Sequence, residues 1–343
     1  MIYKNAELYN VSELLPLEDG GVTWRRVPAW VEEEMQPGGV GMNRAATGVE
    51  IRFVLEGEEA VLRMAALPES YGDGTAMFHV FRGGIQGGWE DHEVDKYVGT
   101  GVHDFVIRRS PNPDFLRRAA AQADDPFDPA VIRIIFDRGH YRLLDILGKI
   151  RPPRREECPA RTLLFYGSSI THGSNAIDQS HSFASVIGHR LHTDVRNLGF
   201  AGHCRMEPAM AEYLAAEGER GAYDAAVLEL GINVLDWEES RIRERVGHLL
   251  RQVAGRNPEK PVLVLSPFYC NEDFRGGTRA ARWRAIIAES VADACLPNLT
   301  YINGLDLLGS AALLSADEVH PNLYGVATIA DRLGEQIRHR IDG

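Results

Sequence analysis

The residues with the clearest chemical potential lie in two short segments that are far apart in the chain. The apolar run at residues 163–166 leads into Gly-Ser-Ser-Ile-Thr-His-Gly at residues 167–173, and Asp317-Glu318-Val319-His320 lies near the far end. A serine on a tight turn bounded by glycines can act as a nucleophile when a histidine takes its proton and a carboxylate orients that histidine. Asp317 and His320 are three residues apart, so one short turn can present them together. The pattern predicts a serine nucleophile served by an aspartate–histidine pair.

The overall charge narrows the classes of partner. The 343 residues carry 37 Lys and Arg against 49 Asp and Glu, a formal net charge of −12, and 44% of them are hydrophobic. This length allows one large or two ordinary domains, each with a substantial core. Affinity for nucleic acid and for anionic lipid comes mainly from cationic side chains, so we expect neither nucleic acid nor a membrane as partner.

The location of the protein is predicted from the segments that the sequence lacks. The first 16 residues have no sustained apolar core, and no stretch approaches the roughly 20 apolar residues of a membrane-spanning helix. The cysteines have no short paired spacing, which favours reduced thiols over a disulfide framework or a zinc site. They are Cys158, Cys204, Cys270 and Cys295. We therefore expect a cytoplasmic protein.

The first part of the chain, residues 1–150, predicts short β-strands separated by glycine-bearing breaks. Residues 49–55 alternate apolar and polar side chains, as in a half-buried strand. Further strands are predicted at residues 60–64, 76–81, 102–107 and 131–136, with a break at Gly57, and residues 114–128 predict a loop with a short helical piece. Several short strands with almost no helical period indicate an antiparallel β-sandwich of jelly-roll type.

The second part of the chain, residues 161–343, predicts alternating strands and helices after a linker at residues 151–160, where paired prolines and charges favour solvent. Strands are predicted at residues 162–166, 194–198, 225–230, 261–265 and 299–302, and helices at residues 183–191, 207–216, 241–253, 279–294 and 323–341. This alternation indicates a parallel sheet covered by helices on both faces. Ligands of such sheets bind outside the carboxyl ends of the strands, which is where the Gly-Ser-Ser turn falls.

Four short motifs occur in order in the second part. They are Gly-Ser-Ser-Ile-Thr at residues 167–171, Asn-Leu-Gly-Phe-Ala-Gly at 197–202, Gly-Ile-Asn at 231–233 and Asp-Glu-Val-His-Pro at 317–321. This series resembles the SGNH (GDSL-type) hydrolase family, whose members are esterases, lipases, carbohydrate deacetylases and some acyltransferases. The likeness covers about half of the chain and implies a flavodoxin-like three-layer α/β/α catalytic domain. The β-rich first part is similar to the accessory sandwich of two-domain members, including carbohydrate esterases.

The resemblance implies a role for each matching residue. Ser169 corresponds to the nucleophile, His320 to the general base and Asp317 to its orienting partner. The N–H groups of Ser169 and Gly202 and the side-chain amide of Asn233 correspond to the oxyanion hole. Such donors stabilise the charge of the transition state, and losing one costs roughly 3–4 kcal/mol. An ordinary imidazole, with a pKa of about 6.5, suits proton exchange near neutral pH. No metal or organic cofactor is implied.

Two positions depart from the family pattern. Ser168 stands where aspartate is common, which removes a charge next to the nucleophile but no member of the triad. Val234 follows Asn233 where aspartate is frequent, and Asp236 lies nearby.

Several other residues have competing interpretations. His172 and His203 follow the first and second motifs and are candidates for lining the pocket. His189 and His192 lack the further residues of a metal-ligand set, so a solvated helix surface is favoured. Core packing is favoured over a sugar-stacking platform for three tryptophans, namely Trp24, Trp30 and Trp89.

The sequence thus predicts a serine-dependent hydrolase that acts through an acyl-enzyme on a small polar or carbohydrate acyl ester. Two alternatives stay open. One is an acyltransferase that uses the same triad with an alcohol acceptor, and the other is a non-catalytic glycan-binding protein. The sequence leaves open the acyl length, the alcohol part of the substrate and the oligomeric state.

Overall fold

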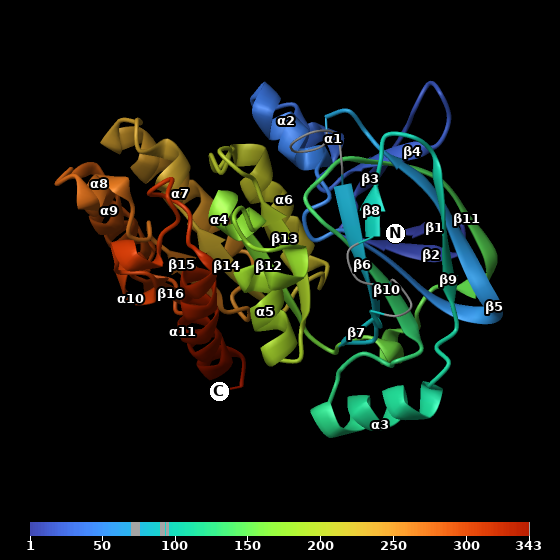
Figure 1. Ribbon diagram of the computed structural model, residues 1–343. Helices are drawn as coiled ribbons and strands as arrows, with labels where there is room; N and C mark the ends of the chain where they lie inside the picture. Colours follow the sequence, from blue (N-terminus) through green and yellow to red (C-terminus); the bar gives the residue numbers. More distant parts are fainter. Residues whose placement is uncertain (70–75, 90–92, 94–95, 343) are drawn as a thin grey trace. The chain divides into compact units, whose positions relative to one another are not determined.

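The computed structural model describes residues 1–69, 76–89, 93 and 96–342 (Figure 1). Contacts divide the chain into two compact units. Unit 1 comprises Met1–Ala29, Asn43–Ala160 and His192–Asp194, and unit 2 comprises Trp30–Met42, Arg161–Leu191 and Val195–Gly343. The segment Trp30–Met42 therefore belongs to unit 2, although most of unit 1 follows it in the sequence. The domain boundaries at residues 150 and 160 stay a prediction.

Unit 1 is built on an antiparallel sheet. Its strands are β1 (Ile2–Tyr3), β2 (Ala6–Tyr9), β3 (Glu13–Pro16), β4 (Val22–Arg25), β5 (Glu50–Ala66), β6 (Ala76–Arg82), β7 (Ile85–Gln86), β8 (Lys96–Val98), β9 (His103–Arg108), β10 (Val131–Phe136) and β11 (Tyr141–Arg151). The main path of hydrogen-bonded neighbours is β3-β4-β11-β5-β10-β6-β7. Of the remaining strands, β2 and β9 pair with β5, β8 pairs with β6, and β1 pairs with β2. Helix α3 (Pro113–Ala123) is the helical piece expected within residues 114–128. The antiparallel fold class of the first part is confirmed.

The long strand β5 corrects one sequence prediction. Two strands with a break at Gly57 were expected, whereas one strand runs from Glu50 to Ala66. Its first half pairs with β2 and β10, its second half pairs with β9, and β11 pairs with both halves. Register shifts in β11, one of them between Gly148 and Ile150, accommodate the irregular stretch. A glycine weakens the interior of a strand without having to end it, so Gly57 was an insufficient reason for a break.

Unit 2 contains a five-stranded sheet. Its strands are β12 (Thr162–Gly167), β13 (Asp194–Gly199), β14 (Ala225–Glu229), β15 (Val262–Leu265) and β16 (Leu299–Ile302). The order β13-β12-β14-β15-β16 is that of a flavodoxin-like doubly wound sheet, and the neighbours from β12 onward run parallel. The predicted parallel sheet with flanking helices is confirmed.

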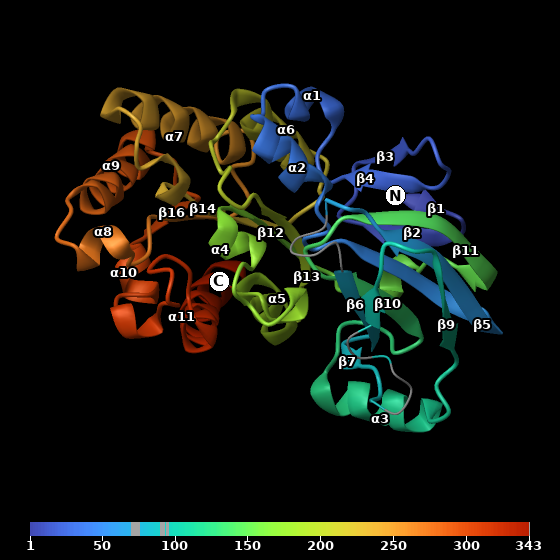
Figure 2. The ribbon, with the colours of Figure 1, turned by 45° about the horizontal axis from the view of Figure 1, so that its top comes forward.

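Helices cover both faces of this sheet. They are α4 (Ser169–His172), α5 (Phe183–Arg190), α6 (Pro208–Glu219), α7 (Glu239–Val253), α8 (Asn271–Phe274), α9 (Arg279–Ala294), α10 (Gly304–Leu307) and α11 (Leu323–Ile341). One core cluster packs Ile187 of α5 and Ile329 of α11 against Phe165, Val227 and Leu263 of the strands. Figure 2 shows α6, α7 and α9 on the opposite side of the strands. The carboxyl ends of the strands share one edge, so the loops after them meet there.

Two short helices from the N-terminal part of the sequence complete unit 2. They are most of α1 (Ala29–Glu32) and of α2 (Pro37–Arg44). Trp30 packs edge-on against Tyr213 of α6 with ring centroids 6.3 Å apart. The Glu34 carboxylate accepts a hydrogen bond of 3.0 Å from the backbone N–H of Ala209, in the first turn of α6. No helix in the described part of the chain is long and apolar enough to cross a membrane.

Candidate active site

The turn between β12 and α4 presents Ser169. Strand β12 ends at Gly167, and Ser169 is the first residue of α4, 8% exposed. Ser168 caps this helix, because its hydroxyl accepts a hydrogen bond of 3.1 Å from the N–H of Ile170. Gly173, at a φ of +90°, ends the helix in the left-handed conformation that glycine adopts without steric cost.

A closed loop before α11 presents Asp317 and His320. Backbone pairing of Leu314 with Pro321, and a 2.8 Å bond from the N–H of Ser315 to the carbonyl of His320, close this loop. Within it, Oδ1 of Asp317 accepts hydrogen bonds from the N–H groups of Val319, at 3.0 Å, and of His320, at 2.9 Å. The aspartate is therefore held by the backbone of its own loop.

The structure brings Ser169, Asp317 and His320 together. Oδ2 of Asp317 lies 2.8 Å from Nδ1 of His320, and Nε2 of His320 lies 2.8 Å from Oγ of Ser169. An ionised carboxylate can only accept hydrogen bonds, so Asp317 favours the tautomer of His320 in which Nδ1 carries the proton and donates it. The lone pair of Nε2 is then directed at the serine hydroxyl, which is the arrangement that a general base requires.

The carboxylate of Asp317 is stabilised in its ionised form. Partial burial opposes ionisation, but bonds from the N–H groups of His320 and Val319 and from the side chains of His320 and Ser315 hold the pKa of Asp317 well below its usual range. Asn175 adds to this set, because its Nδ2 donates to Oδ2 of Asp317 at 3.0 Å and to the Ser315 hydroxyl at 2.9 Å. Asn175 and Ser315 were not predicted from the sequence, because no spacing or motif in the chain marks them.

The loop after β13 carries Gly202. A 2.9 Å bond from the N–H of His203 to the carbonyl of Phe200 closes a four-residue turn, in which Gly202 has a φ of +72°. A turn with a positive φ at its third position favours glycine there. The turn explains the residue type whether or not its N–H binds an oxyanion.

Asn233 lies in the loop after β14, and its amide orientation is fixed. Oδ1 accepts a 3.0 Å hydrogen bond from the N–H of Cys204, a group that can only donate. The Nδ2 donor group of Asn233 is therefore turned away from Cys204. The bond also joins the segment that follows the second motif to the third motif.

The second motif is anchored directly to the serine helix. Nδ2 of Asn197 donates to the carbonyl of Thr171 at 2.8 Å, and its Oδ1 accepts from the N–H of Gly199 at 2.9 Å. A side chain at Gly199 would overlap the backbone of His172, so this close approach requires glycine. Asn197 therefore acts as a brace between β13 and α4.

The part of the chain that carries these loops matches a known protein family. A model of the GDSL-like lipase/acylhydrolase family matches residues 160–338, more than half of the chain. The chain belongs to this family. A comparison with curated protein sequences finds no match.

Solved structures share the fold of this GDSL-like chain over nearly its whole length. One is the salicylyl-acyltransferase SsfX3 from a tetracycline biosynthetic pathway, with a TM-score of 0.76, 16% identity, and coverage of 98% of this chain and 94% of that one. A candidate GDSL-like lipase from Bacteroides ovatus has a TM-score of 0.70, 18% identity, and 98% coverage of both chains. A family two carbohydrate esterase from Cellvibrio japonicus has a TM-score of 0.65, 12% identity, and coverage of 99% and 96%. At these identities the likeness concerns the fold.

The other histidines of this GDSL-like chain occupy different environments. His172 is buried, with its Nδ1 3.4 Å from the carbonyl of Gly199. His203 is partly buried, and burial together with the charge of Arg205 lowers the pKa of His203. The side chains of His189 and His192 are exposed, as expected, but His192 lies beyond the end of α5. No cluster of three or more potential metal ligands occurs among the described residues.

The predictions for the tryptophans were right for one residue of three. Trp24 is fully buried in the core of unit 1. The prediction of core packing was wrong for Trp30 and Trp89, which are 44% and 80% exposed. Their flanking residues gave no period that separates a core face from a solvent face.

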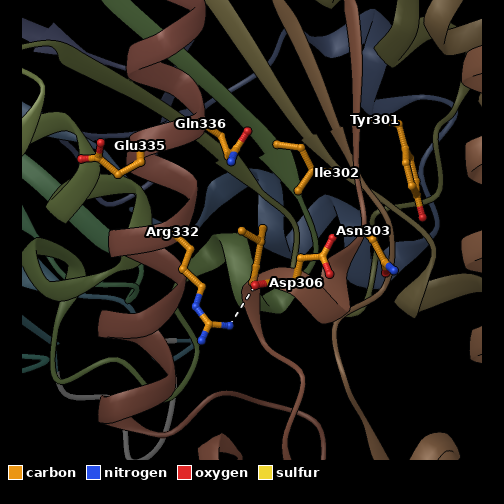
Figure 3. A pocket seen from close by; sticks show the side chains of 8 residues that line it. Tyr301, Ile302, Asn303, Asp306, Arg332, Glu335 and Gln336 are labelled. Atoms are coloured by element: carbon orange, nitrogen blue, oxygen red, sulfur yellow. Dashed lines mark hydrogen bonds between the residues drawn. The ribbon is translucent and has the colours of Figure 1, made fainter.

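A cavity of about 500 Å³ lies at β16, α10 and α11, and it is distinct from the Ser169 site (Figure 3). Arg332 donates a 2.8 Å hydrogen bond across it to the backbone carbonyl of Asp306. The residues that line it are Tyr301, Ile302, Asn303, Asp306, Leu307, Arg332, Glu335 and Gln336. None of them belongs to the four motifs.

Proposed function

We propose that this protein is a serine-dependent carboxylic ester hydrolase that works through an acyl-enzyme. The observation that carries the proposal is the pair of 2.8 Å contacts that join Asp317 to His320 and His320 to Ser169. Membership of the GDSL-like lipase/acylhydrolase family supports the same class of reaction.

The proposed mechanism follows from this geometry. Ser169 Oγ attacks the ester carbonyl while Nε2 of His320 takes its proton, and ionised Asp317 stabilises the imidazolium that forms. The N–H groups of Ser169 and Gly202 and Nδ2 of Asn233 donate to the oxyanion. As the first residue of a helix, Ser169 has an N–H without an intrahelical acceptor. His320 then protonates the leaving alcohol, and a water molecule, activated in the same way, releases the acid.

The proposed substrate is a short acyl ester of a small polar molecule or a carbohydrate. The supporting observation is the shared fold with a family two carbohydrate esterase over almost the entire chain. The net charge of −12 also favours neutral over strongly anionic substrates, since like charges repel.

The test combines turnover with active-site labelling. Wild-type protein should hydrolyse p-nitrophenyl acetate and react with a fluorophosphonate, whereas Ser169→Ala should do neither. Ser310→Ala removes an exposed serine elsewhere in unit 2 and serves as the control with wild-type activity. A panel of acetylated sugars and p-nitrophenyl esters of graded chain length then defines the acyl and alcohol parts. Turnover that persists in Ser169→Ala would refute the proposal.

An acyltransferase is the second candidate, because the salicylyl-acyltransferase shares the fold over 98% of this chain. The triad is the same for both reactions, so only the acceptor distinguishes them. Adding candidate alcohols to the acyl-enzyme and measuring new ester against free acid separates the two. If the wild type neither turns over nor is labelled, glycan titration of Ser169→Ala tests the remaining alternative, a binding protein.

A further inference from the structure

A buried carboxylate lies against the turn that presents Ser169. Glu229 is the last residue of β14, the neighbour of β12 in the parallel sheet, and it is only 1% exposed. Its Oε2 accepts hydrogen bonds from the N–H of Ser168 at 2.7 Å, from the hydroxyl of Ser168 at 2.6 Å and from the hydroxyl of Thr171 at 3.1 Å. The donors, Ser168 and Thr171, lie on both sides of Ser169 in the sequence, so one oxygen is hydrogen-bonded to both ends of the turn.

These bonds also set the direction of the helix cap. The Ser168 hydroxyl has one proton, which it donates in its hydrogen bond to Glu229. The hydroxyl oxygen is therefore free to accept the 3.1 Å hydrogen bond from the N–H of Ile170. A chain of hydrogen bonds thus runs from Ile170 through Ser168 to Glu229. Gly167 makes room for it, since a side chain there would overlap both the Thr171 hydroxyl and Oε2 of Glu229.

The burial of this carboxyl group is costly. Burial raises the pKa of Glu229 above its ordinary value, against the opposing effect of the bonds from Ser168 and Thr171. Its second oxygen, Oε1, is buried without a hydrogen-bond partner among the described residues. A buried polar atom without a hydrogen-bond partner lowers stability, so an apolar side chain would suit position 229 better if packing were its only role.

We propose that Glu229 is a positioning residue for the reaction at Ser169: its carboxyl group holds residues 167–171 so that the Ser169 hydroxyl faces His320. The inference rests on the proposed function of Ser169 as nucleophile. Glu229 acts through Ser168 and Thr171 and lies beneath the turn, so its removal should lower kcat and leave KM nearly unchanged.

The matched test replaces two buried glutamates in the same way. Glu229→Leu removes the shared acceptor. The control, Glu217→Leu, removes another buried acid, which lies on α6, is 8% exposed and pairs with Arg196 of β13 and with Arg220. Both variants should melt at lower temperature. Glu229→Leu should also lower kcat and the rate of fluorophosphonate labelling by about 10- to 100-fold, as small displacements of reacting groups do. Glu217→Leu should leave both rates unchanged.

Two milder variants complete the series. Glu229→Gln keeps an oxygen that accepts from Ser168 and Thr171, so it should recover most of the kcat lost in Glu229→Leu. Thr171→Val removes a single bond at nearly constant volume and should lower kcat by a smaller factor than Glu229→Leu. If Glu229→Leu does not fold, unchanged kcat in both Thr171→Val and Ser168→Ala overturns the inference.

The two ways of failing can be told apart. Wild-type protein without turnover and labelling would refute the proposed function. An active wild type together with a folded Glu229→Leu variant of unchanged kcat would refute only the positioning role, and would leave Glu229 as a residue of the fold.

Discussion

The tautomer of His320 can be reversed by replacing one carboxylate oxygen of Asp317 with an amide NH₂ group. In Asp317→Asn, the amide oxygen must stay at the Oδ1 position, because the N–H groups of Val319 and His320 both donate there. The amide NH₂ then takes the Oδ2 position, which lies 2.8 Å from Nδ1 of His320. A donor at this place favours the tautomer with a bare Nδ1 and a proton on Nε2, so the lone pair that should accept the Ser169 proton is lost.

The expected loss is large and specific to turnover. A triad with intact geometry and the wrong histidine tautomer loses about 10⁴-fold in kcat, which corresponds to roughly 5.5 kcal/mol at 1.36 kcal/mol per factor of ten. The new NH₂ also faces Nδ2 of Asn175, 3.0 Å from the same position. Two donors in contact should make the loop somewhat less stable, but they should not prevent folding.

The assay measures kcat, KM and fluorophosphonate labelling for Asp317→Asn beside a neighbouring control. Glu318→Gln removes a charge from the same loop, breaks only an ion pair with Arg275 at the surface, and should keep wild-type kcat. The reasoning is refuted if Asp317→Asn is folded and retains more than about a tenth of wild-type kcat, because a reversed tautomer cannot support that rate.

Three further predictions concern other parts of unit 2. Asn233→Ala should lower kcat by about 10²–10³-fold; a change in KM alone would remove Asn233 from the oxyanion hole. Gly38→Ala should lower the melting temperature, because the new methyl group overlaps the imidazole of His203, whereas Gly41→Ala, where a methyl group meets nothing, should raise it slightly. Equal melting temperatures would contradict the packing of α2 on His203. Burial raises the pKa of Glu207 from 4.5 to about 7, so the folded chain keeps a proton that the unfolded chain loses as pH rises through this window. Glu207→Gln should therefore stabilise the protein at pH 8, by about 1–3 kcal/mol in denaturant unfolding, and give no gain at pH 4; a gain of the same size at both pH values would contradict the raised pKa.

Much of unit 2 was predictable because its strands and helices have clear periods and lengths. The helices Arg279–Ala294 and Leu323–Ile341 and the strand Leu299–Ile302 have the predicted bounds, since apolar spacing marks each of them and Asn322 caps the start of the last helix. The first 48 residues were harder. Strands β1 to β4 have two to four residues each, too few for an alternating pattern to rise above chance.

The packing of Trp30–Met42 within unit 2 depends on tertiary contacts that the local sequence does not predict. This segment has contacts with α6 and with His203, more than 160 positions later in the chain, whereas its place in the sequence predicted that it belongs to the sandwich. The local pattern of apolar residues predicts which side chains are buried. It does not predict the surface against which they pack.

The sequence by itself determined which residue types are available to the proposed site. A serine at the end of a buried strand, an aspartate and histidine three residues apart, and a glycine and an asparagine at other strand ends were all visible as types and spacings. Parallel strands bring their carboxyl ends to one edge, so order along the chain is enough to predict that such residues meet.

Only the tertiary structure decided which groups support them. Asn175 bonds Asp317 across 142 positions, and Glu229 bonds Ser168 across 61. A hydrogen bond constrains two atoms to lie about 3 Å apart and imposes no spacing in sequence on the residues that carry them. Such partners can therefore be identified from the folded structure and not from their spacing in the sequence.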